Sequence, residues 1–146
     1  MLAAGQRIFL DPVPESGTPA AAASILKPLV AAHPELPLLQ SELAQAQLAA
    51  GDGDSAVATF ERGLEIAPRN VPLTVRYAEA LLDLGKPKKA HVLLLDLFNN
   101  VIPTPEQIKL TALAASAAGD IGDAYYYMSE YHISNGDLML ATTQLD

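Results

Sequence analysis

Apolar and polar positions along most of the chain fit pairs of amphipathic helices joined by short polar turns. The turns carry Gly51, Gly85 and Gly119, which lie 34 residues apart. An alanine lies seven residues before each glycine, another lies five residues after it, and a bulky apolar residue lies nine residues after it. Alanine favours helix and lets two antiparallel helices approach closely, so the pattern predicts helical hairpins packed on small side chains. The three columns are Ala44, Ala78 and Ala112; Ala56, Ala90 and Ala124; and Phe60, Leu94 and Met128.

A 34-residue period of two helices around a turn resembles the tetratricopeptide repeat. The resemblance implies an all-α, right-handed solenoid of antiparallel helix hairpins. Residues 1–19 are expected to form an irregular segment before an array over 20–146. The expected units are a partial repeat over 20–36, full repeats over 37–70, 71–104 and 105–138, and a truncated final helix over 139–146.

Local signals refine these boundaries. In the first full repeat we expect helices at 37–50 and 54–67, the second capped by Asp52 or Asp54. The pair Thr18-Pro19 predicts a helix start, and Asn135-Gly136 predicts a left-handed helix end. Pro28 predicts a kink, because a proline inside a helix removes one hydrogen bond. Residues 1–10 could form a short helix.

Composition narrows the classes of partner. The 146 residues carry a formal net charge of −8, which disfavours nucleic acid and anionic membrane as main partners. No apolar run approaches the roughly 18 residues of a membrane span. There is no cysteine, so disulfides and thiol chemistry are excluded. The first residues show no signal-peptide pattern, which leaves either a cytosolic protein or a missing natural N-terminus; the abrupt C-terminal end favours the second interpretation.

The residues offer no catalytic constellation. The three histidines lack metal-ligand spacing; we expect His33 and His132 at helix ends, and His91 to face water. The aspartates cluster at turns, where helix capping explains them. We therefore predict that this chain is not an enzyme and holds neither a metal nor a cofactor.

Four tyrosines crowd one predicted helix, at positions 125, 126, 127 and 131. Neighbouring helical residues point about 100° apart, so at least one of Tyr125, Tyr126 and Tyr127 must be exposed or covered by a partner. We favour the interpretation in which Tyr131 and Met128 fill the core over one in which the tyrosines form a binding patch.

The tetratricopeptide resemblance implies a concave groove lined by the first helix of each pair. It places Ser41, Ala49, Val75 and Leu113 there, among other residues. Some co-chaperones of the family clamp a carboxylate with lysines and asparagines, and this set is not matched, since the corresponding positions include Glu106 and Leu110. The candidate partner-binding residues are Gln45, Arg76, Glu79, Asp83, Lys109, Tyr126 and Tyr127.

A finer resemblance covers residues 20–146. The runs AASILKPLVAAHPELPLLQSELAQAQLAAGD, PRNVPLTVRYAEALLDLGKPKKA and GDAYYYMSEYHISNGDLMLATTQLD resemble the C-terminal repeats of bacterial M48-type zinc metallopeptidases of the β-barrel assembly-enhancing group. It implies a periplasmic interaction module that contacts its own peptidase domain and the outer-membrane protein assembly machinery. Zinc is expected only in that separate domain, which carries H-E-x-x-H. The alternative is a free-standing adaptor or assembly scaffold without a protease.

The chain's last residues predict a further helix that begins at Asp137. Its apolar residues would either fold back on the third repeat or contact another molecule, so we predict a possible dimer through this end. They are Leu138, Leu140, Ala141 and Leu145.

Overall fold

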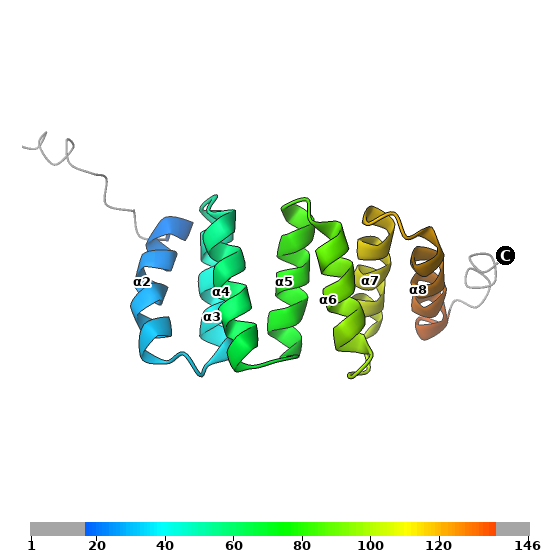
Figure 1. Cartoon of the computed structure of the whole chain (residues 1–146), viewed down its shortest axis with the longest axis horizontal. Coiled ribbons are helices and arrows are strands. Elements are labelled where there is room, and N and C mark those ends of the chain that lie inside the picture. Colours follow the sequence, from blue (N-terminus) through cyan, green and yellow to red (C-terminus); the bar gives the residue numbers. More distant parts are fainter. Residues whose placement is uncertain (1–16, 137–146) are drawn as a thin grey trace, which may run out of the picture.

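The computed structural model describes residues 17–136, and within this range the chain forms seven α-helices and no strand (Figure 1). The predicted short helix at 1–10, the helix from Asp137 and its dimer contact lie outside the described residues. The helices are α2 (Pro19–Ala32), α3 (Pro37–Ala49), α4 (Gly53–Ile66), α5 (Val71–Asp83), α6 (Pro87–Phe98), α7 (Pro105–Ala117) and α8 (Ile121–Ser134).

The helices follow one another in a row of antiparallel hairpins (Figure 1). The hairpins are α3 with α4, α5 with α6, and α7 with α8, while α2 packs against α3. The first helices of the three hairpins also contact each other in sequence, α3 with α5 and α5 with α7. This arrangement confirms the predicted all-α solenoid, and α3 and α4 lie within one residue of the helix limits expected for the first repeat.

The repeating glycines end the first helix of each hairpin in the left-handed conformation. The φ angles of Gly51, Gly85 and Gly119 are 85°, 74° and 87°. After Gly51, the Asp52 amide donates to the Gln47 carbonyl at 2.9 Å and the Gly51 amide donates to Leu48 at 3.0 Å. This pair of bonds satisfies the last carbonyls of α3 and fixes the direction of the following helix.

Side-chain caps begin the helices where the sequence predicts them. The Thr18 hydroxyl accepts from the Ala21 amide at 3.1 Å, and Asp52 rather than Asp54 caps α4 by accepting from Ser55 at 3.1 Å. Helix α2 runs unbroken through Pro28 to Ala32.

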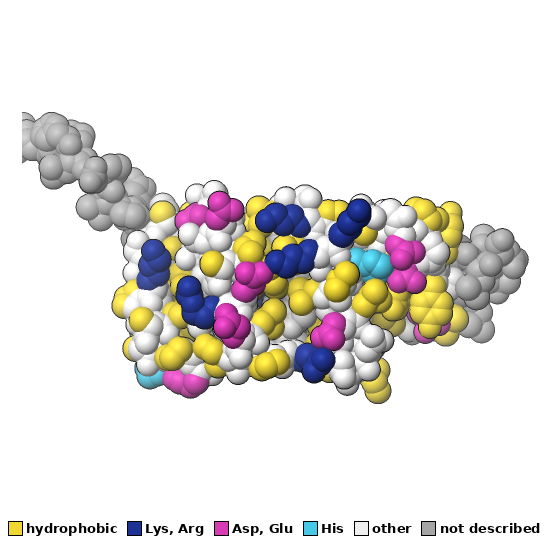
Figure 2. Space-filling model, viewed as in Figure 1, with side chains coloured by type: hydrophobic (Ala, Val, Ile, Leu, Met, Phe, Trp, Pro, Cys, Tyr) yellow, Lys and Arg dark blue, Asp and Glu magenta, His cyan; other side chains and the backbone are white. Residues whose placement is uncertain are grey.

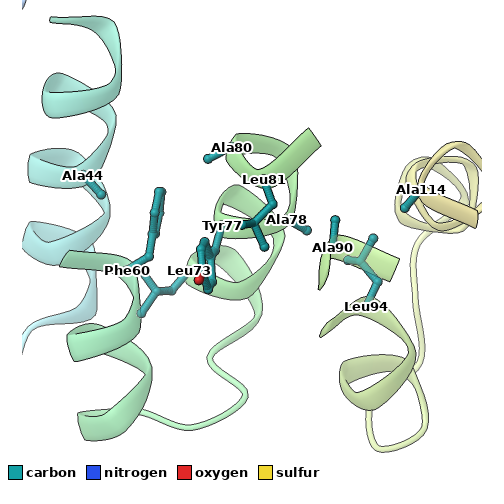
Figure 3. Packing of buried hydrophobic residues seen from close by; sticks show 10 residues of the cluster. All are labelled: Ala44, Phe60, Leu73, Tyr77, Ala78, Ala80, Leu81, Ala90, Leu94 and Ala114. Carbon is teal, nitrogen blue, oxygen red and sulfur yellow. The ribbon is translucent and has the colours of Figure 1, made fainter. Parts of the chain in front are cut away.

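The alanine columns lie where helices meet, as Figure 3 shows for the centre of the array. Ala44, Ala56, Ala78 and Ala90 are fully buried. The bulky column fills the space beside them: Phe60 is fully buried, and its ring stacks on the next repeat's Tyr77 with ring centroids 5.2 Å apart. The core is therefore a continuous layer that crosses the repeat boundaries.

Candidate protein-binding groove

A cavity of about 680 Å³ opens between α3 and α5. Arg76, Glu79 and Asp83 line it from α5, where spacings of three and four residues place them on one face. Gln45 lines it from α3, so four of the seven candidate binding residues lie together. Its apolar lining comes from Leu48, Ala49, Phe60, Ala80 and Leu84.

A second cavity, of about 280 Å³, continues the groove along the same two helices, and Arg76 lines both. Leu38 on its rim is 68% exposed, and the buried Ser41 hydroxyl has no hydrogen-bond partner among the described residues. No ion pair among the described residues involves Arg76, Glu79 or Asp83. The α3–α5 groove, meaning both cavities, thus combines apolar surface with charged groups that are free to contact a ligand.

The other three candidates lie away from this groove. Lys109 is exposed on α7, with its Nζ 5.6 Å from the Tyr131 ring centroid. Tyr126 and Tyr127 lie on α8 and pack edge to face, 5.1 Å between centroids. Burial raises the pKa of Tyr127, and the nearby Asp123 carboxylate adds to this shift. No single site among the described residues unites all seven.

The tyrosine helix agrees only partly with the favoured interpretation. Tyr125 and Tyr126 are exposed, which confirms that the three consecutive tyrosines cannot all be buried. Tyr131 and Met128, expected to fill the core, are only half-buried. Within the described residues α8 packs against α7 on one side, which explains the incomplete burial.

The expectation that His91 faces water is wrong. Its ring is 7% exposed, and its Nε2 lies 3.1 Å from Asp123 Oδ2. This hydrogen bond links α6 to the first turn of α8 and satisfies the buried ring. The other two histidines lie at helix ends as predicted: His33 is the C-cap of α2, and His132 is in the last turn of α8.

Three possible metal ligands come together here, since one ligand atom each of His91, Asp120 and Asp123 lies within 4.8 Å of the others. Asp120 already caps α8 by accepting from the Asp123 amide at 3.0 Å. Helix capping and the bond between α6 and α8 account for all three positions, so we attribute the group to packing.

A cavity of about 330 Å³ between α2 and α4 was not predicted from the sequence. Lys27 and Arg62 line it from these two helices, and Gln40 lines it from α3. The sequence does contain one signal of this cavity. Positions 62 and 96 are equivalent by the 34-residue period, yet they hold residues of opposite charge, Arg62 and Asp96.

The grooves and the stacked hairpins define a class of protein, the helical-repeat scaffold that holds other proteins. This chain belongs to the tetratricopeptide repeat family, whose model matches residues 15–69 and 48–101. The chain is therefore a protein–protein interaction module, with a fold that generally carries no catalytic activity of its own.

Solved structures with the same fold include two of MamA, one described as "MamA RS-1 ArsTM double mutant" and one as residues 41 to the end from Desulfovibrio magneticus RS-1. Their TM-scores are 0.68 and 0.67; each is 18% identical, and the match covers 88% of this chain and 82% of the other. TTC0263, a tetratricopeptide protein of Thermus thermophilus, has a TM-score of 0.67 at 20% identity, over 87% of this chain and 73% of its own. These identities establish the fold alone.

Curated proteins gave no match to this chain. Over residues 17–136, every helix is too short or too polar to cross a membrane.

Proposed function

We propose that the α3–α5 groove binds an extended segment of a partner protein. The observation that carries this proposal is the continuity of the two cavities along α3 and α5, with Arg76 at their junction. Arg76, Glu79 and Asp83 together carry a net negative charge and form no internal ion pairs, so a segment with a basic residue fits best. Leu38 and Leu48 offer apolar contacts to its neighbouring side chains.

Site-specific photo-crosslinking tests this proposal in cells of the source organism. A photoreactive phenylalanine analogue replaces Gln45 or Glu79 in the groove, and Lys88 on α6 serves as an exposed control position. We expect discrete crosslinked adducts from the two groove positions, identified by mass spectrometry, and none from position 88. Equal adducts from all three positions, or adducts from position 88 alone, would argue against the groove.

We infer further that this module belongs to a periplasmic M48-type metallopeptidase that monitors outer-membrane protein assembly. The resemblance of residues 20–146 to the repeats of that group supports this inference. The partners would then be the cognate peptidase domain and the assembly machinery. Zinc would reside in the peptidase domain, and this chain would need no cofactor.

The genomic reading frame around Met1 tests the inference about the parent protein. It should encode a signal peptide and an H-E-x-x-H peptidase domain upstream of these repeats. A frame that lacks both would instead favour the free-standing adaptor. That result would leave the proposed binding role of the groove intact, because the crosslinking experiment does not depend on a peptidase.

A further inference from the structure

The cavity between α2 and α4 lies on other helices than the proposed groove. Both helices pack on α3, and the cavity lies where α3 forms the floor between them. Figure 2 shows basic side chains on the face of the molecule formed by α2 and α4, with acidic side chains beside them over α4. The cavity is lined by Lys27, Val30, Ala31, Pro34, Gln40, Leu43, Gln47, Ser55, Ala58, Thr59 and Arg62.

The next repeat contains an equivalent cavity, of about 250 Å³, between α4 and α6 over α5. Five lining positions of the two cavities correspond through the 34-residue period. They are Val30 with Leu64, Pro34 with Pro68, Gln40 with Thr74, Thr59 with Leu93, and Arg62 with Asp96. The two cavities are therefore one structural site in two copies, so differences between their side chains can be compared directly.

The copies differ in how their charges are satisfied. In the α4–α6 copy, the Arg69 guanidinium donates to both Asp96 carboxylate oxygens, at 3.1 and 3.3 Å. In the α2–α4 copy, Arg62 replaces that aspartate, and neither Arg62 nor Lys27 forms an ion pair with another described residue. One copy thus contains an ion-paired carboxylate, while the two exposed cations of the other form no ion pair, although Asp52 lies within electrostatic range of Lys27.

The floor of the α2–α4 copy also has unused hydrogen-bonding groups. Gln40 is fully buried, and neither its Nε2 nor its Oε1 has a partner among the described residues. The equivalent Thr74 leaves only one such atom, its Oγ1. A buried amide without partners has lost its hydrogen bonds to water, so it is rarely retained without a ligand or water to satisfy it. Beside it, Thr59 donates to Gln47 at 2.6 Å, which orders the polar wall.

We propose that the α2–α4 cavity binds a glutamate or aspartate side chain from an acidic segment of a partner protein. Arg62 and Lys27 supply the opposite charge, and the Gln40 amide supplies a hydrogen-bond donor at the floor. Val30, Pro34 and Leu43 contact the hydrocarbon part of the bound side chain. The bound carboxylate pairs with Arg62, which holds the position of Asp96 in the other copy, because Glu35, aligned with Arg69, lies 3.5 Å from His33 instead. This site goes beyond the α3–α5 groove and would bind a segment of opposite charge.

The charge of the whole chain favours a short acidic segment over a polyanionic surface. A net charge of −8 repels nucleic acid or an anionic bilayer over distances of about a Debye length. A single carboxylate needs only local cations, and Lys27 and Arg62 both line the cavity. The apolar part of the lining also suits a carboxylate on a hydrocarbon stem better than inorganic phosphate.

Fluorescence anisotropy with a fluorescein-labelled tetraglutamate peptide tests this proposal, with the full chain as the binding partner. Tetraglutamine, free glutamate and inorganic phosphate serve as competitors. We expect saturable binding of tetraglutamate that tetraglutamine does not displace, with free glutamate and phosphate at least about tenfold weaker than the peptide. No binding up to about 1 mM, or competition by phosphate or free glutamate as strong as that by the peptide, would overturn the proposal.

Three variants locate the site. Arg62→Asp copies the residue of the other cavity and should weaken tetraglutamate binding at least tenfold, to about the level of background. Gln40→Met keeps the volume, removes the amide, and should weaken binding about threefold or more. Lys88→Glu makes the same change in net charge as Arg62→Asp, on an exposed part of α6, and should retain binding.

Circular dichroism of each variant, before titration, separates loss of binding from loss of fold. A folded Arg62→Asp chain that still binds tetraglutamate would overturn the proposal. So would equal weakening by Lys88→Glu, because that result means non-specific attraction. If Arg62→Asp fails to fold, Arg62→Gln replaces it, and the same two outcomes decide.

Discussion

The central helices α4 and α6 and the last described helix α8 occupy the same position in successive repeats, yet they are buried to different degrees. Their alanines at the small-residue column are Ala56, Ala90 and Ala124; the first two are fully buried and the third is half-buried. The bulky column shows the same difference, because Phe60 is fully buried while Met128 is half-buried. A repeat column therefore sets the register of a helix, while burial also requires a following hairpin to cover it.

The largest expected difference concerns the bulky column. Phe60→Ala removes a fully buried ring that stacks on Tyr77, so it should reduce the free energy of unfolding by about 3–5 kcal/mol. Met128→Ala removes a half-buried side chain and should cost about 1–2 kcal/mol. Urea denaturation followed by circular dichroism measures both. Equal losses would show that another part of the protein covers α8.

Overpacking at the small-residue positions should likewise have a larger effect in the centre of the array, here on α5, than on α8. Ala78→Leu inserts a larger side chain at a fully buried contact and should cost about 1–3 kcal/mol. Ala124→Leu lies on half-covered α8, where the side chain can turn toward solvent, and should cost less than about 1 kcal/mol. Thermal unfolding of the two variants provides the comparison. An unchanged melting temperature for Ala78→Leu would contradict the repeat register.

A hydrogen bond from His91 to Asp123 links α6 to α8. His91→Ala should lower stability by about 1–3 kcal/mol, because it removes a buried ring and leaves Asp123 without that partner. Amide hydrogen exchange should show a larger loss of protection in α8 than in α4. Asp123→Asn keeps an acceptor and should lose less; a greater loss than that of His91→Ala would contradict this assignment.

The sequence predicts the helices well because their signals are local. The 34-residue spacing of Gly51, Gly85 and Gly119 marks the turns, and each glycine adopts the left-handed conformation that such a turn requires. His91 could not be assigned in this way. Its hydrogen-bond partner is Asp123 in α8, 32 residues further along the chain, which no local pattern reveals.

The residues that line the two candidate sites also divide into those that local sequence signals could assign and those that depend on distant parts of the chain. Gln45 and Arg76 could be assigned to one groove because their positions within a helix fix the face on which they lie. The role of Arg62 could not be predicted by the same reasoning, since it depends on whether any carboxylate from a neighbouring helix reaches it. The structure shows that Arg62 forms no ion pair with another described residue.

The smallest predicted effect is electrostatic and lies in the central region, where one carboxylate links three helices. Glu61 on α4 accepts from Lys89 on α6 at 2.7 Å and from the Tyr77 hydroxyl on α5 at 2.8 Å. The hydrogen bond from Lys89, followed by that from Tyr77, lowers the pKa of Glu61, and the Glu61 carboxylate raises the pKa of Lys89. Burial raises the pKa of Tyr77.

The pH dependence follows from the signs of these shifts. The lowered pKa of Glu61 means that its contribution to stability is complete above the unfolded value of about 4.3 and is lost as the pH falls through the folded value. The raised pKa of Lys89 means that its contribution is complete below about 10.4 and is lost as the pH rises through the folded value. Both side chains are about half exposed, so the pair should contribute less than about 1 kcal/mol.

Glu61→Gln tests this electrostatic link, because glutamine can still accept from Tyr77 but carries no charge. At pH 7 the variant should lose less than about 1 kcal/mol, and its stability should fall less steeply than that of the parent chain below about pH 4. Glu65→Gln is the control, because Glu65 is an exposed carboxylate on the same helix and forms no ion pair among the described residues. It should leave the loss of stability at acid pH unchanged. If the stability of Glu61→Gln falls at acid pH as steeply as that of the parent chain, the charge of Glu61 adds nothing to the packing of the central helices.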